Sequence, residues 1–231
     1  MPHPHLAVEA SPGGYWRVRL ARPERRNALD VSLLRAVTEA LAAEPGVPVL
    51  LTSADPRVFC AGADLTITDA ERAAVSDLVY DCCETIITRP GPVIAVLTGP
   101  AVGGGAQLAA ASDLRIAGPS ARLRWTGPPG LELAVGAWLL PDLLARAAAM
   151  DLVLTRRGVE AAEALALGLV NRVCDDPEPV AAQIAADLAG RGAGAWAGAG
   201  VKSVMAAGGL LDRMRAERSA NRSAWARVLA G

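Results

Sequence analysis

Two glycine-containing turns hold the residues whose types and spacing best suit chemistry. Ala61–Asp64 follows an apolar segment, and Gly103–Gly105 lies between an apolar run and a helical pattern. Glycine lets the backbone approach a ligand closely and adopt positive φ. The amides that open a helix are unpaired and favour negative charge. Two such amides converging on one oxygen would form an oxyanion hole, in which each donor is typically worth about 10²–10³ in rate.

Other chemistries fit the sequence less well. The glycine triplet alone is equally compatible with tight packing of a strand on a helix, and it matches neither G-x-G-x-x-G after the first strand nor G-x-x-x-x-G-K-[ST]. The only histidines are His3 and His5. A Ser–His pair needs a fixed imidazole, so a serine peptidase is not expected. The four cysteines lack metal-ligand spacing, so we expect no metal site.

Composition limits the remaining classes. The chain has 231 residues, of which 52% are hydrophobic and 20% are charged, so one large α/β domain with a sizeable core is expected. A net charge of −1 excludes a general nucleic-acid-binding face. Aromatic residues make up 3%, which argues against base-stacking platforms.

The longest uncharged stretch, Pro90–Ser112, does not indicate a membrane span. Pro92, Pro100 and several glycines interrupt it, which is typical of a strand, a turn and a helix. The first ten residues contain no apolar signal segment. Four cysteines without metal spacing indicate reduced thiols, so a cytoplasmic location is expected.

The elements that must position the two turns alternate between strands and helices. Asp30 is a predicted N-cap. The predicted strands are 15–20, 47–51, 93–97, 114–117 and 169–173, and the predicted helices follow Asp30 and span 70–88, 103–111, 159–168 and 201–229. From Pro141 the chain is predicted to be largely helical, with a loose Ala/Gly-rich connector at 192–200. The repeated order of strands and helices favours an α/β architecture with stacked turns.

Four segments, in order and in register, resemble the crotonase superfamily (enoyl-CoA hydratase/isomerase family). They are ARPERRNALD (Ala21–Asp30), VFCAGADL (Val58–Leu65), GPAVGGGAQLAAASDLRIA (Gly99–Ala117) and the stretch Ala145–Val173. The resemblance implies a crotonase-like α/β spiral of repeated ββα turns with a C-terminal helical region. It implies a core with the acyl-CoA site at residues 1–190 and a helical trimerisation segment at 191–231.

The resemblance also implies a ligand and its contacts. The ligand would be a coenzyme A thioester, with coenzyme A as part of the substrate and no separate cofactor, bound by a homotrimer or a dimer of trimers. The amides of Ala63 and Gly104 would hold the thioester carbonyl. Backbone contacts to the adenine and pantetheine would come from Ala61, Gly62, Asp64 and Leu65. Arg25 or Arg26 would lie near the phosphates, although a solvated surface charge is an equally good interpretation of both.

The acidic positions depart from the family pattern. Family hydratases use two glutamates, and the place of the first is occupied by Gln107, which has no carboxylate to accept a proton. The place of the second falls at Thr126 or Gly127. The aspartate of some isomerases and dehalogenases corresponds to Ala134. Each missing general acid or base typically costs about 10²–10⁴ in rate, so standard hydration is expected to be impaired.

One acid remains near these positions. Glu132 is flanked by apolar residues, and burial there would raise its pKa and suit a single-base isomerase. A surface or interface glutamate is the alternative. Two hypotheses stay open: a hydratase or isomerase that uses Glu132 and Gln107, or a non-catalytic acyl-CoA binding or carrier protein. Lys202 is the only lysine and lies near the start of the last predicted helix.

Overall fold

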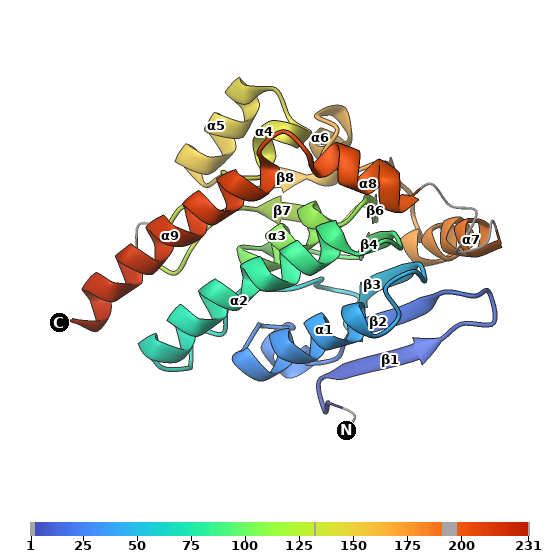
Figure 1. Cartoon of the computed structure of the whole chain (residues 1–231), viewed down its shortest axis with the longest axis horizontal. Helices are drawn as coiled ribbons and strands as arrows, with labels where there is room; N and C mark the ends of the chain where they lie inside the picture. Colours follow the sequence, from blue (N-terminus) through green and yellow to red (C-terminus); the bar gives the residue numbers. More distant parts are fainter. Residues whose placement is uncertain (1–2, 132, 191–197, 231) are drawn as a thin grey trace.

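Two sheets form the framework in the computed structural model, which describes residues 3–131, 133–190 and 198–230 (Figure 1). The larger sheet has the order β1-β2-β3-β4-β6-β9, and the smaller has the order β5-β7-β8. Within the larger sheet, β1 and β2 are antiparallel, and the other described pairs of neighbouring strands are parallel. The strands are β1 (Leu6–Ala10), β2 (Trp16–Leu20), β3 (Val49–Ser53), β4 (Val93–Leu97), β5 (Ala101–Val102), β6 (Leu114–Ala117), β7 (Arg122–Arg124), β8 (Val159–Glu160) and β9 (Arg172–Val173).

Helices follow most of the strands and complete the spiral of stacked turns. A short 3-10 helix spans Pro23–Arg25. The α-helices are α1 (Val31–Ala43), α2 (Asp69–Thr88), α3 (Gly104–Ala111), α4 (Leu140–Leu143), α5 (Arg146–Thr155), α6 (Ala161–Ala166), α7 (Pro177–Gly190), α8 (Gly198–Ala206) and α9 (Leu210–Leu229). The predicted crotonase-like α/β fold is therefore confirmed.

The central strands are apolar on both faces because helices cover both. Successive strand residues point to opposite faces, so Leu50 and Ile94 pack with Ala181 of α7, whereas Leu51 and Ala95 join the larger core. All five residues of β3 and all five of β4 are buried. The continuous apolar runs in the sequence are explained by this two-sided burial.

The predicted local signals agree with the structure in the first half of the chain. The strands 93–97 and 114–117 and the helix ending at Thr88 are present, and Asp30 Oδ1 accepts a hydrogen bond of 2.8 Å from the Leu33 amide as the N-cap of α1. At the start of α2, Thr68 and Glu71 form a reciprocal capping box.

Two predicted helices differ from the observed elements. Residues 159–160 form β8, which pairs with β7, so the helix begins only at Ala161. The single helix expected at 201–229 is divided into α8 and α9, because Gly208 and Gly209 adopt φ of +94° and +91°, which end one helix before the next begins. Residues 192–197 of the predicted connector and the boundary proposed at 191 lie outside the described residues, whereas residues 198–200, also predicted as connector, belong to α8.

The last helix is fastened to the wall of the core. Figure 1 shows α9 running alongside α2, and the two helices are in contact. Arg218 of α9 forms a two-pronged ion pair with Asp77 of α2, with N···O distances of 2.7 and 2.6 Å, and Arg222 binds the same carboxylate. No helix among residues 3–131, 133–190 and 198–230 is both long enough and apolar enough to cross a membrane.

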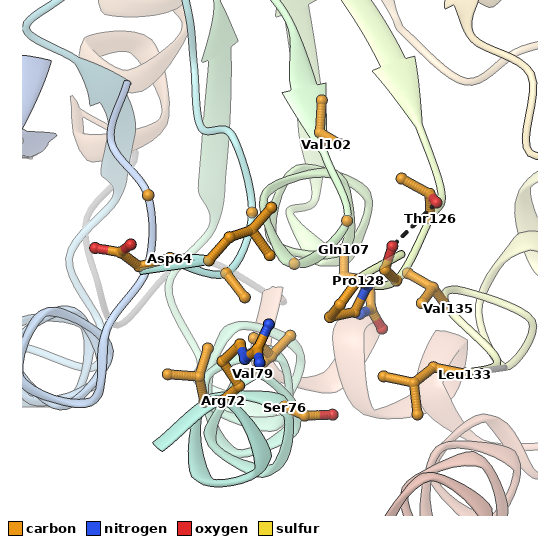
Figure 2. A pocket seen from close by; sticks show the side chains of 18 of the residues that line it. Asp64, Arg72, Ser76, Val79, Val102, Gln107, Thr126, Pro128, Leu133 and Val135 are labelled. Atoms are coloured by element: carbon orange, nitrogen blue, oxygen red, sulfur yellow. Dashed lines mark hydrogen bonds between the residues drawn. The ribbon is translucent and has the colours of Figure 1, made fainter. Parts of the chain in front are cut away.

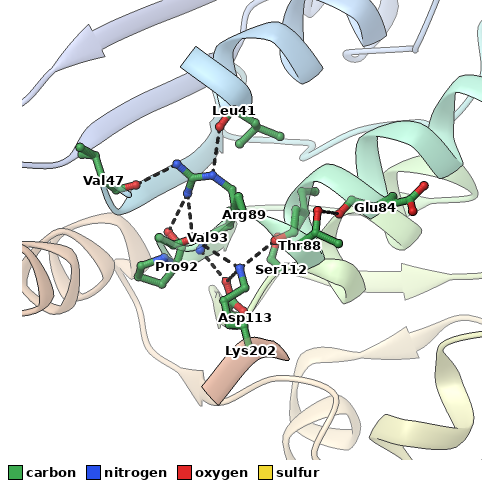
Figure 3. A network of polar contacts seen from close by, with 12 residues as sticks. Leu41, Val47, Glu84, Thr88, Arg89, Pro92, Val93, Ser112, Asp113 and Lys202 are labelled. Carbon is green, nitrogen blue, oxygen red and sulfur yellow. Dashed lines mark hydrogen bonds and ion pairs between the residues drawn. The ribbon is translucent and has the colours of Figure 1, made fainter. Parts of the chain in front are cut away.

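A polar network joins α8 to the end of α2 (Figure 3). Lys202 Nζ lies 2.8 Å from Asp113 Oδ2 and donates to the Ile86 carbonyl. Arg89, which is 4% exposed, donates to five backbone carbonyls, those of Leu41, Glu44, Val47, Gly91 and Pro92. Burial lowers the pKa of Lys202, although Asp113 opposes that shift. The only lysine thus packs inside the protein.

Candidate functional site

Strand-like pairing with Leu29 turns the Ala63 amide away from the Leu29 segment. The Leu29 amide donates to the Gly62 carbonyl over 2.7 Å, and the Asp64 amide donates to the Leu29 carbonyl over 2.9 Å. In a parallel bridge of this kind, the residue between the two partners points its own N–H to the other side. No described residue accepts a hydrogen bond from the Ala63 amide.

The second turn presents a comparable amide. Gly104 is the first residue of α3, so its N–H has no partner within the helix, and none of the described residues accepts from it. The preceding Gly103 has φ of +55° and donates to the Arg124 carbonyl over 2.8 Å. A bridge between Cys60 and Ala101 fastens this turn to the first one.

Glycine is required where the two turns meet. Gly62 has φ of +87°, and a Cβ there would lie 2.8 Å from the Val102 carbonyl oxygen. A Cβ on Gly103 would lie 2.8 Å from the Thr126 carbonyl oxygen. Both backbone collisions are closer than real Cβ contacts, so Gly62 allows the two turns to lie against each other, and Gly103 allows the second turn to lie against the chain after β7.

Ala63 and Gly104 line one cavity of about 480 Å³ (Figure 2). Arg72, Ser76 and Val79 of α2 form one side, as the figure shows. The opposite side comes from the chain after β7, and α9 contributes Asn221 and Trp225. Other lining residues are Arg25, Ala61, Gly62, Asp64, Leu65, Tyr80, Val102, Gln107, Arg124, Thr126, Gly127, Leu133 and Val135.

Most of the site residues predicted from sequence meet at this cavity. Ala61, Gly62, Asp64, Leu65, Arg25 and Gln107 join Ala63 and Gly104 on its wall. Arg26 does not line it: this residue is exposed, and its left-handed backbone directs its carbonyl to the Ala61 amide over 3.0 Å. Glu132 lies outside the described residues.

The Asp64 carboxylate supports the turn. It accepts hydrogen bonds from the Thr66 amide and hydroxyl over 2.9 and 2.7 Å, and Arg22 Nη1 lies 2.9 Å away. Burial raises the pKa of Asp64, but the Thr66 hydrogen bonds and Arg22 outweigh it and lower the pKa overall. Asp64 is the one acidic residue on the cavity wall within the described part of the chain, and these partners keep its carboxylate ionised.

Gln107 presents a hydrogen-bond donor to the cavity. Its Oε1 accepts from the Trp138 indole Nε1 over 2.9 Å. An indole N–H only donates, so this partner must hold the oxygen of the amide, and Nε2 takes the other direction. Trp138 is buried and lies behind the cavity wall. Gln107 therefore has the polarity opposite to that of a general base.

The other predicted acid positions contribute no carboxylate. Thr126 and Gly127 line the cavity, and the Thr126 hydroxyl donates to the Gly127 carbonyl over 3.2 Å. Ala134 is not on the wall among the described residues, and its amide donates to Asn221 Oδ1 over 3.0 Å. Thr126 and Gly127 therefore give the cavity wall only backbone and a small side chain, and Ala134 binds Asn221, which also lines the cavity.

The sequence interpretation missed a buried polar network beside the cavity. Tyr80 donates to Glu217 Oε1 over 3.0 Å, and Asn221 Nδ2 donates to the Tyr80 hydroxyl over 2.7 Å. Glu217 also accepts from the amides of Gly136 and Trp138 over 3.0 and 2.9 Å. Burial raises the pKa of Glu217, although these hydrogen bonds oppose the shift. The spacing of Glu217, Asn221 and Trp225 by four residues was a signal that they share one helix face.

Comparisons with known proteins agree with this geometry. The family model described as enoyl-CoA hydratase/isomerase matches residues 11–217. A putative enoyl-CoA hydratase from Thermus thermophilus is 40% identical over 183 residues, covering 72% of this chain and 70% of that protein. A probable enoyl-CoA hydratase from Mycobacterium leprae is 37% identical over 194 residues, covering 76% of this chain and 73% of that protein.

A solved structure extends the likeness over the whole fold. The crystal structure of an enoyl-CoA hydratase from Mycobacterium avium subsp. paratuberculosis has a TM-score of 0.85 at 26% identity, and the match covers 100% of this chain and 92% of that one. The family match spans both glycine turns and the strands and helices that position them. The chain belongs to the enoyl-CoA hydratase/isomerase family of the crotonase superfamily.

Proposed function

We propose that this protein binds an acyl thioester of coenzyme A and holds the thioester carbonyl oxygen between the amides of Ala63 and Gly104. The observation that carries the proposal is that two unpaired backbone donors from separate turns line one cavity. Such fixed donors stabilise negative charge that develops on a carbonyl oxygen. Membership of the family, whose relatives are described as enoyl-CoA hydratases, supports a thioester ligand.

Charge on the lining supports the coenzyme A part of the ligand. Arg25, Arg72 and Arg124 contribute to the cavity wall, and each carries a guanidinium that suits phosphate oxygens. The turn from Ala61 to Leu65 would lie along the adenine and pantetheine. Coenzyme A enters as part of the ligand, and the proposal needs no separate cofactor.

Standard hydration would be impaired in this protein. Hydration requires a group that removes a proton from water, and the Gln107 amide cannot accept one at neutral pH. Its hydrogen bond with Trp138 turns a donor toward the cavity, which favours the second candidate function, a non-catalytic acyl-CoA binding or carrier protein. In the enzymatic alternative, Glu132 would serve as the single base.

Infrared spectroscopy tests the carbonyl contact directly. Butanoyl-CoA labelled with ¹³C at the thioester carbonyl is added to the protein, and the carbonyl stretch is followed by isotope-edited difference spectra. Two hydrogen bonds to the oxygen would lower its stretching frequency relative to the ligand in water. Binding with an unshifted carbonyl, or equal calorimetric affinity for free coenzyme A and butanoyl-CoA, would overturn the proposed role of the two amides.

Turnover separates the enzyme from the carrier. But-2-enoyl-CoA is offered to the wild type, Glu132→Ala and Gln107→Glu, with Gln107→Leu as the matched control for a change of side chain. Turnover that Glu132→Ala abolishes supports the enzyme. Binding without turnover in the wild type, with hydration gained only in Gln107→Glu, supports the carrier.

The assembly and location belong to the same proposal. We expect a homotrimer or a dimer of trimers in the cytoplasm, assembled through residues 191–231. Three apolar side chains of α8, those of Val201, Val204 and Met205, are 55%, 74% and 78% exposed in the single chain, which suits an interface. Light scattering coupled to size-exclusion chromatography would measure the mass, and a monomer would contradict this expectation.

A further inference from the structure

The Gln107 amide is a fixed donor in a largely apolar part of the cavity. Gln107 is only 5% exposed, yet no described residue accepts a hydrogen bond from its Nε2. Trp138, which is not among the lining residues described, holds Oε1, so Nε2 is the amide atom left to face the cavity. An inward-facing polar group that lacks a partner favours a ligand that supplies one.

A second set of contacts locks this orientation. The Trp138 amide donates to Glu217 Oε2 over 2.9 Å, and the Gly136 amide donates to Oε1 of the same carboxylate over 3.0 Å. Glu217 of α9 thereby fixes the backbone that carries the Trp138 indole. Rotation of the Gln107 amide would bring its NH₂ group against an indole N–H, two donors facing each other.

The position of Gln107 on α3 relates its donor to the proposed carbonyl site. Gly104 and Gln107 are three residues apart, so they lie on one face of the helix, separated by about 4.5 Å along its axis. Helical side chains lean back toward the N-terminus, which brings the Gln107 amide toward the Gly104 end. Both residues line the same cavity.

Several apolar side chains share the cavity with Gln107. Val79, Val102, Leu133 and Val135 line the cavity with Gln107, and Figure 2 shows the Gln107 side chain among them. A plain alkyl chain would leave the Gln107 donor without a partner and without water. A ligand oxygen a short distance along the acyl chain from the carbonyl would satisfy it.

We propose that Gln107 is a specificity-determining residue that selects acyl thioesters with an acceptor oxygen on the third carbon, as in 3-oxoacyl thioesters. The inference rests on the proposed function, because the thioester carbonyl at Ala63 and Gly104 sets the register of the acyl chain. Gln107 Nε2 donates to the 3-oxo oxygen, Trp138 orients the amide, and Glu217 fixes Trp138. No bond is made or broken in this recognition.

Calorimetry with a matched pair of ligands tests the inference. Acetoacetyl-CoA and butanoyl-CoA have the same chain length and differ in the 3-oxo group. One hydrogen bond of ordinary strength predicts about tenfold tighter binding of acetoacetyl-CoA by the wild type. In Gln107→Leu the ratio falls to about one, and in Gln107→Glu it inverts, because a carboxylate oxygen replaces the donor. Trp138→Phe, which frees the amide to rotate, reduces the ratio without removing Gln107.

Butanoyl-CoA binding controls for folding in each variant, because none of its proposed contacts, with the two backbone amides, the arginines and the 61–65 turn, needs the Gln107 donor. The ultraviolet spectrum of bound acetoacetyl-CoA separates the ketone from its enolate, which the backbone amides could select without Gln107. A ratio of one in the wild type, a ratio that persists in Gln107→Leu, or an enolate spectrum would overturn the role of Gln107 while leaving the proposed function intact. Failure of the wild type to bind either thioester would overturn the proposed function instead.

Discussion

The indole Nε1 of Trp138 donates a hydrogen bond of 2.9 Å to Oε1 of Gln107, and both side chains are at least 95% buried. This pair decides which end of the Gln107 amide faces the cavity, because the amide can face the indole only through its oxygen. The neutral residue at the place of a family glutamate therefore acts as an oriented donor. The geometry makes four further expectations measurable.

The first expectation concerns the stability that this hydrogen bond provides. Trp138→Phe removes the indole N–H and leaves a buried Gln107 oxygen without a partner. Trp125→Phe is the matched control, because Trp125 is equally buried but its Nε1 has no partner among the described residues. We expect Trp138→Phe to lower the free energy of unfolding by about 1 kcal/mol more than Trp125→Phe. Equal costs in urea denaturation would contradict this.

The second expectation concerns the contact between the two glycine turns. Gly62→Ala adds a Cβ at 2.8 Å from the Val102 carbonyl oxygen at a positive φ, so the turns must separate. Gly130→Ala has a similar φ of +78° with no atom within 4 Å of the new Cβ. Gly130→Ala should lower the free energy of unfolding by about 1 kcal/mol, because the positive φ is unfavourable for alanine even where no atom collides with the new Cβ.

Gly62→Ala should cost about 1–3 kcal/mol beyond that control and weaken butanoyl-CoA binding, because the collision falls beside the proposed carbonyl site. Thermal unfolding and calorimetry measure the two effects. If Gly62→Ala matched Gly130→Ala in both, the close approach of the turns would have no energetic importance.

The third expectation concerns acid stability. Hydrogen bonds from Arg218, aided by Arg222, lower the pKa of Asp77 in the folded protein despite partial burial. A lowered folded pKa contributes stability above the unfolded pKa of about 3.9, and this contribution is lost as the pH falls toward the folded pKa. Asp77→Asn should cost about 1–2 kcal/mol at pH 7, where the pair is charged.

Denaturation at pH 7 and at pH 3 measures how the free energy of unfolding changes with pH. The difference in the free energy of unfolding between the wild type and Asp77→Asn should be smaller at pH 3, because the wild type has then lost part of the stability that the ionised Asp77 provides. Asp212→Asn is the control: Asp212 forms an exposed ion pair with Arg215 in the same helix, and its effect should be small at both values. A gap that widens at pH 3 would contradict the assignment.

The fourth expectation concerns Lys202. Replacing it by Met leaves Asp113 without its cation in a half-buried site, and the Ile86 carbonyl loses a donor. We expect a loss of about 3 kcal/mol, against less than about 1 kcal/mol for Arg215→Met at an exposed ion pair. Chemical denaturation of both variants checks this, and equal losses would show that the Lys202 network adds no stability.

The parts of the site that depend on local backbone geometry were predictable from the sequence. Glycine at Gly62 and Gly103 satisfies a short-range requirement, so the two turns were identified and both line one cavity. The division of the last helix was also present in the sequence, as Gly208–Gly209, but helical periodicity on either side outweighed it in the prediction.

The orientation of Gln107 was not predictable, because it depends on partners that are distant in sequence. Trp138 is 31 residues from Gln107, and Glu217 is a further 79 residues from Trp138. Periodicity reports which residues share a helix face, but it does not report which side chain of another element lies opposite. Arg25 and Arg26 are adjacent in sequence, and which of them lines the cavity depends on the local backbone conformation, which is left-handed at Arg26.

The chain of contacts from Glu217 to Trp138 has a consequence for how the protein matures. During synthesis the pocket walls from the first two-thirds of the sequence emerge before α9, so they can pack while the indole is still unanchored. Ligand discrimination would then be acquired last, when residue 217 docks beneath residues 136–138. The pocket is complete only after this docking, because α9 also supplies Asn221 and Trp225 to its wall.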